Sequence, residues 1–180
     1  MQMTDIRRSV EEDRGILKKI QSVIPGYAGY RRREDIRQAD SQLRTQMADR
    51  LHDVRAALEE SRRAMVDNMV TEGIDSIGGL INKTTALEGR VRHAEQGYSG
   101  FSAAIRIEEN ELNRLYEYDY AMVASIQDLL RQAAELKVAV DASDPARTKG
   151  SVDAIRANLT NFTRAFEERI PRIAGIYNMG

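Results

Sequence analysis

Apolar residues that recur at spacings of three and four constrain this chain more than any other feature. That spacing places them along one side of a helix, where they need a packing partner. The cleanest example lies within residues 102–140 and follows a heptad repeat. Its members are Ile105, Leu112, Leu115, Asp119, Met122, Ile126, Leu129, Ala133, Leu136 and Val140. One of them, Asp119, is polar.

The same spacing predicts helices over residues 4–23, 30–70, 74–95, 102–140 and 151–177, and no segment shows strand alternation. Two of these helices have about 40 residues, against a mean of ~11–12 in globular proteins. We therefore expect an all-α fold: an elongated antiparallel helical bundle with long coiled-coil-like helices, formed by residues 1–180 as a single domain. The pattern leaves open whether the second and third helices form a hairpin or one bent rod.

Proline and glycine mark the expected breaks between helices. Pro25 and Gly26 end the first helix, because proline cannot continue the backbone hydrogen bonding. Residues 141–150 form the clearest loop, in which Asp144 and Pro145 can start a short helical turn. Pro171 is expected to kink or split the last helix.

Composition excludes several classes of protein. The 180 residues include no Cys, so disulfide scaffolds, thiolate catalysis and Cys-ligated metals are excluded. A net charge of −1 argues against a protein coated in nucleic acid, and 42% hydrophobic residues argue against disorder. No signal peptide and no apolar stretch of the ~18 residues needed to span a membrane is readable, which favours the cytoplasm.

Two turns share an unusual pattern of glycine and aromatic residues. Residues 26–30 read Gly-Tyr-Ala-Gly-Tyr, and residues 97–101 read Gly-Tyr-Ser-Gly-Phe. Both are explained by helix-ending turns, in which glycine adopts positive φ and the aromatic ring covers the last helical turn. The alternatives are a shared binding surface and a duplicated helix pair. The aromatic residues that are candidates for such a surface are Tyr27, Tyr30, Tyr98 and Phe101.

A cluster of arginines follows the first turn. Arg31, Arg32, Arg33 and Arg37 lie at a predicted helix start, where cations are disfavoured by the helix dipole by ~0.3–1 kcal/mol. One interpretation is an anionic partner: phosphate, nucleic acid or an anionic membrane surface. The other is a solvated face of mixed charge, because residues 25–70 hold nine Lys and Arg and eight Asp and Glu.

An acidic, tyrosine-rich stretch spans residues 108–120. We predict that Asp119 and Tyr116 are buried polar residues, with Asp119 paired to an arginine or to tyrosine hydroxyls and fixing the helix register. Acid–base catalysis is the alternative, although the sequence places no second catalytic group beside Asp119. We also consider that the arginine cluster and the acidic stretch meet, within one chain or between two chains.

The sequence predicts no metal, cofactor or catalytic site. Di-iron helical bundles need Glu three residues before each ligating His, and neither His52 nor His93 has one. Glycine-rich phosphate loops are absent. With two histidines, no Ser-His-Asp arrangement can be argued, and no small-molecule substrate is predicted.

Three stretches together resemble a prokaryotic family of all-helical proteins. They read Pro25-Gly-Tyr-Ala-Gly-Tyr-Arg-Arg-Arg-Glu34, Gly97-Tyr-Ser-Gly-Phe101 and Glu108-Glu-Asn-Glu-Leu-Asn-Arg-Leu-Tyr-Glu-Tyr-Asp119. In that family, Pro-Gly-Tyr-x-Gly-Tyr is combined with a later Glu-Leu-x-Arg-Leu-Tyr-Glu-x-Asp. The resemblance implies an all-helical fold. It implies no activity, so no functional residue is carried over.

From these observations we expect a non-enzymatic interaction or scaffold protein that binds a protein partner or associates with itself through its heptad helices. The alternative is binding to an anionic membrane surface or to nucleic acid through Arg31–Arg37.

Overall fold

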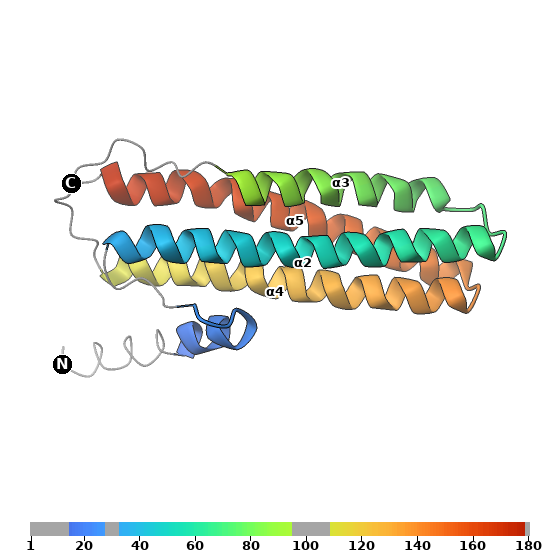
Figure 1. Cartoon of the computed structure of the whole chain (residues 1–180), viewed down its shortest axis with the longest axis horizontal. Helices are drawn as coiled ribbons and strands as arrows, with labels where there is room; N and C mark the ends of the chain where they lie inside the picture. The colour runs from blue at the N-terminus through green and yellow to red at the C-terminus, as the bar shows by residue number, and fades with distance from the viewer. Residues whose placement is uncertain (1–14, 28–32, 95–108, 179–180) are drawn as a thin grey trace. The chain divides into compact units, whose positions relative to one another are not determined.

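A computed structural model of the chain describes residues 15–27, 33–94 and 109–178 (Figure 1). Within these ranges the backbone is helical apart from short turns and contains no strand. A first helical segment, residues 15–23, precedes four long helices: α2 (Arg33–Asp67), α3 (Ile74–His93), α4 (Glu109–Asp141) and α5 (Pro145–Asn178). The helices pack against one another, so the expectation of an all-α helical bundle is confirmed for the described residues.

The boundary between α4 and α5 differs from the prediction. The loop expected over residues 141–150 is confined to a short turn, because α5 begins at Pro145. Oδ1 of Asp144 accepts a hydrogen bond from the backbone amide of Arg147 at 3.0 Å and so caps the helix. Proline suits the first helical position, where its missing amide hydrogen has no intrahelical partner. The Asp-Pro pair therefore starts the long helix itself.

Of the kink or split expected at Pro171, the split does not occur. α5 continues through this residue to Asn178 as one helix. Proline removes one backbone hydrogen bond, but its φ is compatible with a helix, so the flanking turns can carry the helix past it.

The chain divides into two compact units, and α2, α4 and α5 contribute residues to both. Unit 1 comprises Met1–Arg44, Glu95–Val123 and Ala165–Gly180, and unit 2 comprises Thr45–Ala94 and Ala124–Arg164. The single domain over residues 1–180 stays a prediction.

Unit 2 is a ring of four helix segments linked by polar side chains. α2 and α4 run in one direction, and α3 and α5 run in the other (Figure 1). α2 and α3 form a hairpin, which answers the question that the sequence leaves open. Each neighbouring pair is joined by polar contacts, for example Arg55 to Glu88 (α2–α3), Lys83 to Thr160 (α3–α5), Ser125 to Asn158 (α4–α5) and Lys137 to Glu60 (α4–α2).

The interior of unit 2 is filled by apolar side chains that recur at helical spacing on its four helix segments. Burying one large aliphatic side chain contributes about 1.5–3 kcal/mol, so these stripes account for much of the stability of the unit. The buried residues include Met47, Leu51, Val54, Leu58, Met65, Ile77, Leu80, Leu87, Val91, Ile126, Leu129, Leu136, Val140, Ile155, Leu159 and Phe162. Within unit 2, the apolar stripes of α2 and α4 are therefore covered by the chain itself.

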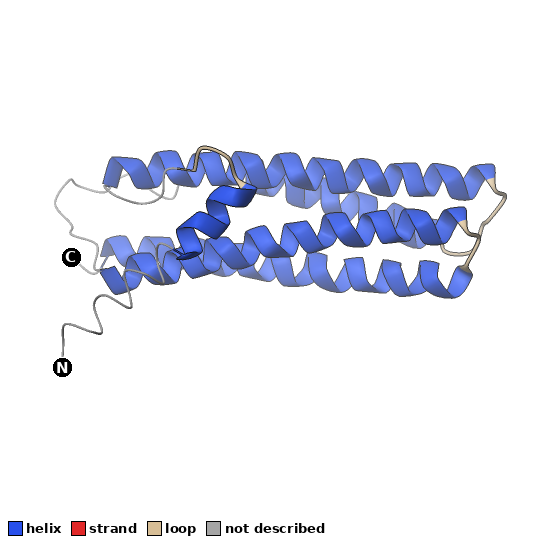
Figure 2. Cartoon of the chain, turned by 90° about the horizontal axis from the view of Figure 1, so that it is seen from below, coloured by secondary structure: helices blue, strands red, loops and turns tan. Residues whose placement is uncertain are grey.

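In unit 1, the first helical segment packs against α4. Lys19 Nζ lies 5.4 Å from the centre of the Tyr120 ring, and Figure 2 shows the segment crossing the long helices obliquely. The amide of Tyr27 donates to the carbonyl oxygen of Ile24 at 3.2 Å, and Gly26 has φ 80°. Proline followed by glycine with positive φ is typical of a type II turn. This turn ends the segment and directs Tyr27 into the interior.

Candidate functional site

A row of alternating charges lies in the interior of unit 1. Arg169 is at its centre: Nε donates to Oδ1 of Asp119 at 2.7 Å, and Nη1 donates to Oδ1 of Asp40. Nε of Arg44 donates to Oδ2 of Asp40 at 2.9 Å. The hydroxyl of Tyr27 donates to Oδ2 of Asp119 at 3.2 Å. We call these five residues the buried polar row.

The buried polar row is almost completely removed from solvent. The side chains of Arg169, Asp40 and Asp119 are 3%, 4% and 0% exposed, respectively. A buried carboxylate without partners is costly, but each of the four carboxylate oxygens here accepts a hydrogen bond. Each charged group is hydrogen-bonded to a group of opposite charge. Such an arrangement is better suited to fixing the register of the helices than to transferring protons.

Helical spacing explains how three charged side chains reach one place. Asp40 on α2 precedes the buried Leu43 by three positions, and Arg169 on α5 follows the buried Phe166 by three. Each therefore lies on the inward stripe of its own helix. Asp119 holds the corresponding position on α4, between Leu115 and Met122.

The two residues that the sequence predicts to be buried, Asp119 and Tyr116, are both in the core of unit 1. The sequence pattern did not single out the other three members of the row, Asp40, Arg44 and Arg169. The available signal was the same as for Asp119: a charged residue at an apolar stripe position.

The interpretation of Tyr27 as a surface residue is wrong. Its side chain is 1% exposed, because the Pro-Gly turn carries it inward to Asp119. Tyr30, Arg31, Arg32, Tyr98 and Phe101 lie outside the described residues. Arg33 and Arg37 belong to the first turns of α2, and their side chains also lie outside the described set.

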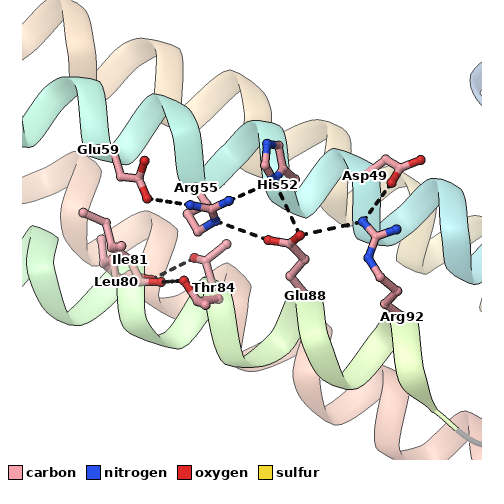
Figure 3. A network of polar contacts seen from close by, with 10 residues as sticks. Asp49, His52, Arg55, Glu59, Leu80, Ile81, Thr84, Glu88 and Arg92 are labelled. Carbon is pink, nitrogen blue, oxygen red and sulfur yellow. Dashed lines mark hydrogen bonds and ion pairs between the residues drawn. The ribbon is translucent and has the colours of Figure 1, made fainter.

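A second polar network joins α2 to α3 in unit 2 (Figure 3). Glu88 of α3 accepts from Arg55 Nε at 3.2 Å and lies 3.7 Å from Arg92 Nη2. Arg92 donates to Asp49 at 2.8 Å, and Arg55 donates to Glu59 at 2.6 Å. The Glu59 contact, with that of Glu88, raises the pKa of Arg55 above its usual value.

This network fixes the pairing of the two helices of the hairpin. His52 adds to it, because its Nδ1 lies 2.9 Å from Arg55 Nη2 and 3.5 Å from Glu88 Oε1. The His52 side chain is 53% exposed and its contacts are satisfied locally, so each member of the network has a structural explanation.

The third feature is a cavity of about 460 Å³ at the end of unit 2 where its two helical connections lie. This volume lies within the ~300–1,000 Å³ range of ligand pockets. Its apolar lining includes three buried side chains, those of Met65, Val140 and Val152. Its charged lining residues are Glu72, Asp144, Lys149, Asp153 and Arg156. We call it the end cavity.

The turn that ends α2 lies beside the end cavity. The amide of Val70 donates to the carbonyl oxygen of Met65 at 2.8 Å, and that of Met69 donates to Val66 at 3.0 Å. These two bonds define a Schellman motif, whose penultimate residue adopts a left-handed conformation and is usually glycine. Here it is Met69, with φ 55°, a conformation that costs a non-glycine residue about 1–2 kcal/mol.

α4 ends in the same motif. The amide of Asp144 donates to the carbonyl oxygen of Ala139 at 3.0 Å, and that of Ser143 donates to Val140 at 2.9 Å. Ser143 takes the left-handed position, with φ 49°. The two connections of unit 2 thus present two non-glycine residues at positions that favour glycine.

Large apolar side chains are exposed near this end. Met69 is 89% exposed, Val66 is 58% exposed and Val138 is 55% exposed. Single exposed apolar residues are ordinary on protein surfaces. Met69 differs because it combines near-complete exposure with a strained backbone, next to a cavity with an apolar lining.

Within residues 15–27, 33–94 and 109–178, no group of three or more His, Asp or Glu side chains is placed to hold a metal ion. In the same part of the chain, no helix has both the length and the apolar character to cross a bilayer. No protein-family model, curated protein or solved structure matches the chain.

Proposed function

We propose that this protein is a non-enzymatic interaction or scaffold protein that associates with itself. Two features support this. The charged groups of the buried polar row neutralise one another inside unit 1, which suits a structural role. The exposed apolar residues and the end cavity, both in unit 2, are the described features that suit a binding partner.

The route of association follows from where the apolar surface lies. The sequence favours self-association through the heptad helices. In the structure, Leu51 and Leu58 of α2 and the heptad residues Ile126 and Leu136 of α4 are fully buried within unit 2. Their packing leaves them no surface to offer a second chain, and association through them would require the unit to open. The exposed apolar surface around Met69 requires no opening.

The observation that carries the proposal is the conformation and exposure of Met69. Glycine or asparagine would complete the Schellman motif at lower cost, and a polar side chain would be better solvated. A methionine that is both strained and exposed is accounted for if its side chain becomes buried against a partner.

Self-association is tested by mixing two versions of the full chain, one with an affinity tag and one without, at equal concentrations. We expect the untagged copy to be retained with the tagged copy, and to a greater extent as the total concentration rises. An unrelated helical protein of similar size serves as the control for non-specific retention. Retention no greater than this control at every concentration would contradict the proposal.

The second proposed function is binding to an anionic membrane surface or nucleic acid through Arg31–Arg37. Its support is the start of α2 at Arg33, which puts a cation where the helix dipole disfavours it. Such binding should weaken steeply with salt, and changing Arg31, Arg32 and Arg33 to Glu should abolish it. Titration with anionic vesicles and with RNA at low salt tests both forms. An absence of binding in both would exclude this function.

A further inference from the structure

We propose that two copies of this chain form a two-fold dimer through the end of unit 2, in which Met69 of each copy enters the end cavity of the other. This inference rests on the proposed self-association and names the surface that performs it.

The apolar parts of the surface match one another. Met69 projects an unbranched, adaptable side chain from the turn after α2, and the end cavity is lined by Met65, Val140 and Val152. The cavity volume of about 460 Å³ exceeds that of one methionine side chain. Because the projecting residue and the cavity lie at the same end of one unit, a two-fold axis can place each against the other simultaneously.

The charges around the cavity indicate that the partner is a second copy. Asp153 is paired with Arg156 at 2.9 Å, and Asp144 keeps its charge but is held as the helix cap by the bond that it accepts from the backbone of Arg147. That leaves Lys149 of α5 and Glu72 of the α2–α3 connection, which line the cavity without an ion-pair or hydrogen-bond partner among the described residues.

Lys149 and Glu72, the two cavity-lining side chains of opposite charge that have no partner within the described residues, make this surface self-complementary. Across a two-fold axis, Lys149 of each copy faces Glu72 of the other, and the pair occurs twice. A partner of strongly acidic or strongly basic character would leave one of the two charges opposite a like charge. A second copy satisfies both.

The interface is small, since each copy contributes two turns and the rim of its end cavity. Interfaces that bury less than ~1,200 Å² are typical of transient complexes. We therefore expect a weak dimer that is populated at high protein concentration.

The test is a charge exchange followed by sedimentation equilibrium of the full chain. Because each substitution acts at both symmetric contacts, K149E or E72K alone should raise the dimer dissociation constant about tenfold or more. The double variant K149E/E72K restores opposite charges and should return the constant to within about threefold of the wild type. The matched control is R164E, at an exposed arginine of α5 that does not line the cavity.

A variant of Met69 tests the apolar part. M69D should weaken the dimer at least as much as K149E, with an unchanged helical circular dichroism spectrum. V152F, which fills the cavity, should do the same. Its folding is checked by its urea unfolding transition.

The outcomes separate this inference from the proposed function. A wild-type dimer that is unaffected by K149E, E72K and M69D would overturn the interface and leave self-association standing. A wild-type chain that stays monomeric at millimolar concentration would overturn both. Binding of a small apolar probe such as anilinonaphthalene sulfonate without any dimer would also overturn the interface, because the cavity would then hold a small ligand.

Discussion

Arg169 lies against Asp119 with 2.7 Å between Nε and Oδ1, and neither side chain is more than 3% exposed. The two residues are on different helices, α5 and α4, and Arg169 also donates to Asp40 of α2. Three helices of unit 1 therefore meet at one guanidinium. A sliding of any of the three would leave a charge without its partner inside the unit, which is why such pairs are effective in fixing register.

Asp119→Asn should destabilise unit 1 strongly. Breaking a buried ion pair by removing one partner costs about 3–5 kcal/mol. Arg169 would keep its bond to Asp40, but the buried polar row would then hold two arginines and one aspartate. We expect a lower urea midpoint, followed by helical circular dichroism. Asp128→Asn, at an exposed position of α4, is the control and should change stability by less than about 0.5 kcal/mol.

The pair can also be removed as a whole. Asp119→Leu combined with Arg169→Met should recover part of the loss, because it removes one charge of each sign and leaves Asp40 paired with Arg44. Stability and oligomeric state that are unchanged in Asp119→Asn would contradict the structural role of Asp119.

Tyr27→Phe should loosen the first helical segment. The substitution keeps the ring but removes the donor to Oδ2 of Asp119, which leaves a buried carboxylate oxygen short of a hydrogen bond and costs about 1–3 kcal/mol. Hydrogen exchange should show faster exchange for amides of residues 15–27 than in the wild type. Tyr120→Phe keeps the ring near Lys19 and is the matched control. Equal exchange in both variants would argue against the Tyr27–Asp119 contact.

Met69→Gly and Ser143→Gly should both stabilise the chain. Glycine adopts the left-handed conformation at each position without the steric cost of a side chain, which is worth about 1 kcal/mol. For a chain of this size that corresponds to a rise in Tm of about 2–4 °C. The two variants should differ in self-association, because only Met69→Gly removes the projecting side chain. Equal dimerisation of the two would show that Met69 has no part in the contact.

Alkaline pH should remove the contribution of Lys137 to the stability of the folded chain. Its Nζ donates to Asp141 Oδ2 at 2.5 Å, and this hydrogen bond raises the pKa of Lys137 above its ordinary value of 10.5. Because the pKa is higher in the folded state, the contribution is complete below about pH 10.5 and is lost as the pH rises through the raised value. The difference in urea midpoint between wild type and Lys137→Met should therefore shrink from pH 9 to pH 11.5. A constant difference would contradict the assignment.

The sequence predicted the all-helical fold because aliphatic stripes at helical spacing admit few other structures. It also predicted the burial of Asp119, since that residue stands inside the stripe of Leu115 and Met122. Asp40 and Arg169 follow the same rule, but neither is marked by the apolar pattern of its helix alone. The start of α5 at Pro145 could not be told from a loop, because an Asp-Pro pair is common both in turns and at helix starts.

The end cavity could not have been predicted from sequence. Its lining comes from residues 65–76 and 140–156, which are far apart in the chain and meet only when the two hairpins pack. The burial of Tyr27 could not be predicted from the sequence either. Its Gly-Tyr context is compatible with an exposed ring or a buried one, and the difference is decided by the charge of Asp119 on another helix.

Self-association of the chain is tested most directly by sedimentation equilibrium of the wild-type protein over a wide range of concentrations. We expect an average mass that rises from the monomer value of 20.3 kDa towards twice that value as concentration increases. A mass that stays at 20.3 kDa up to millimolar concentration would contradict it.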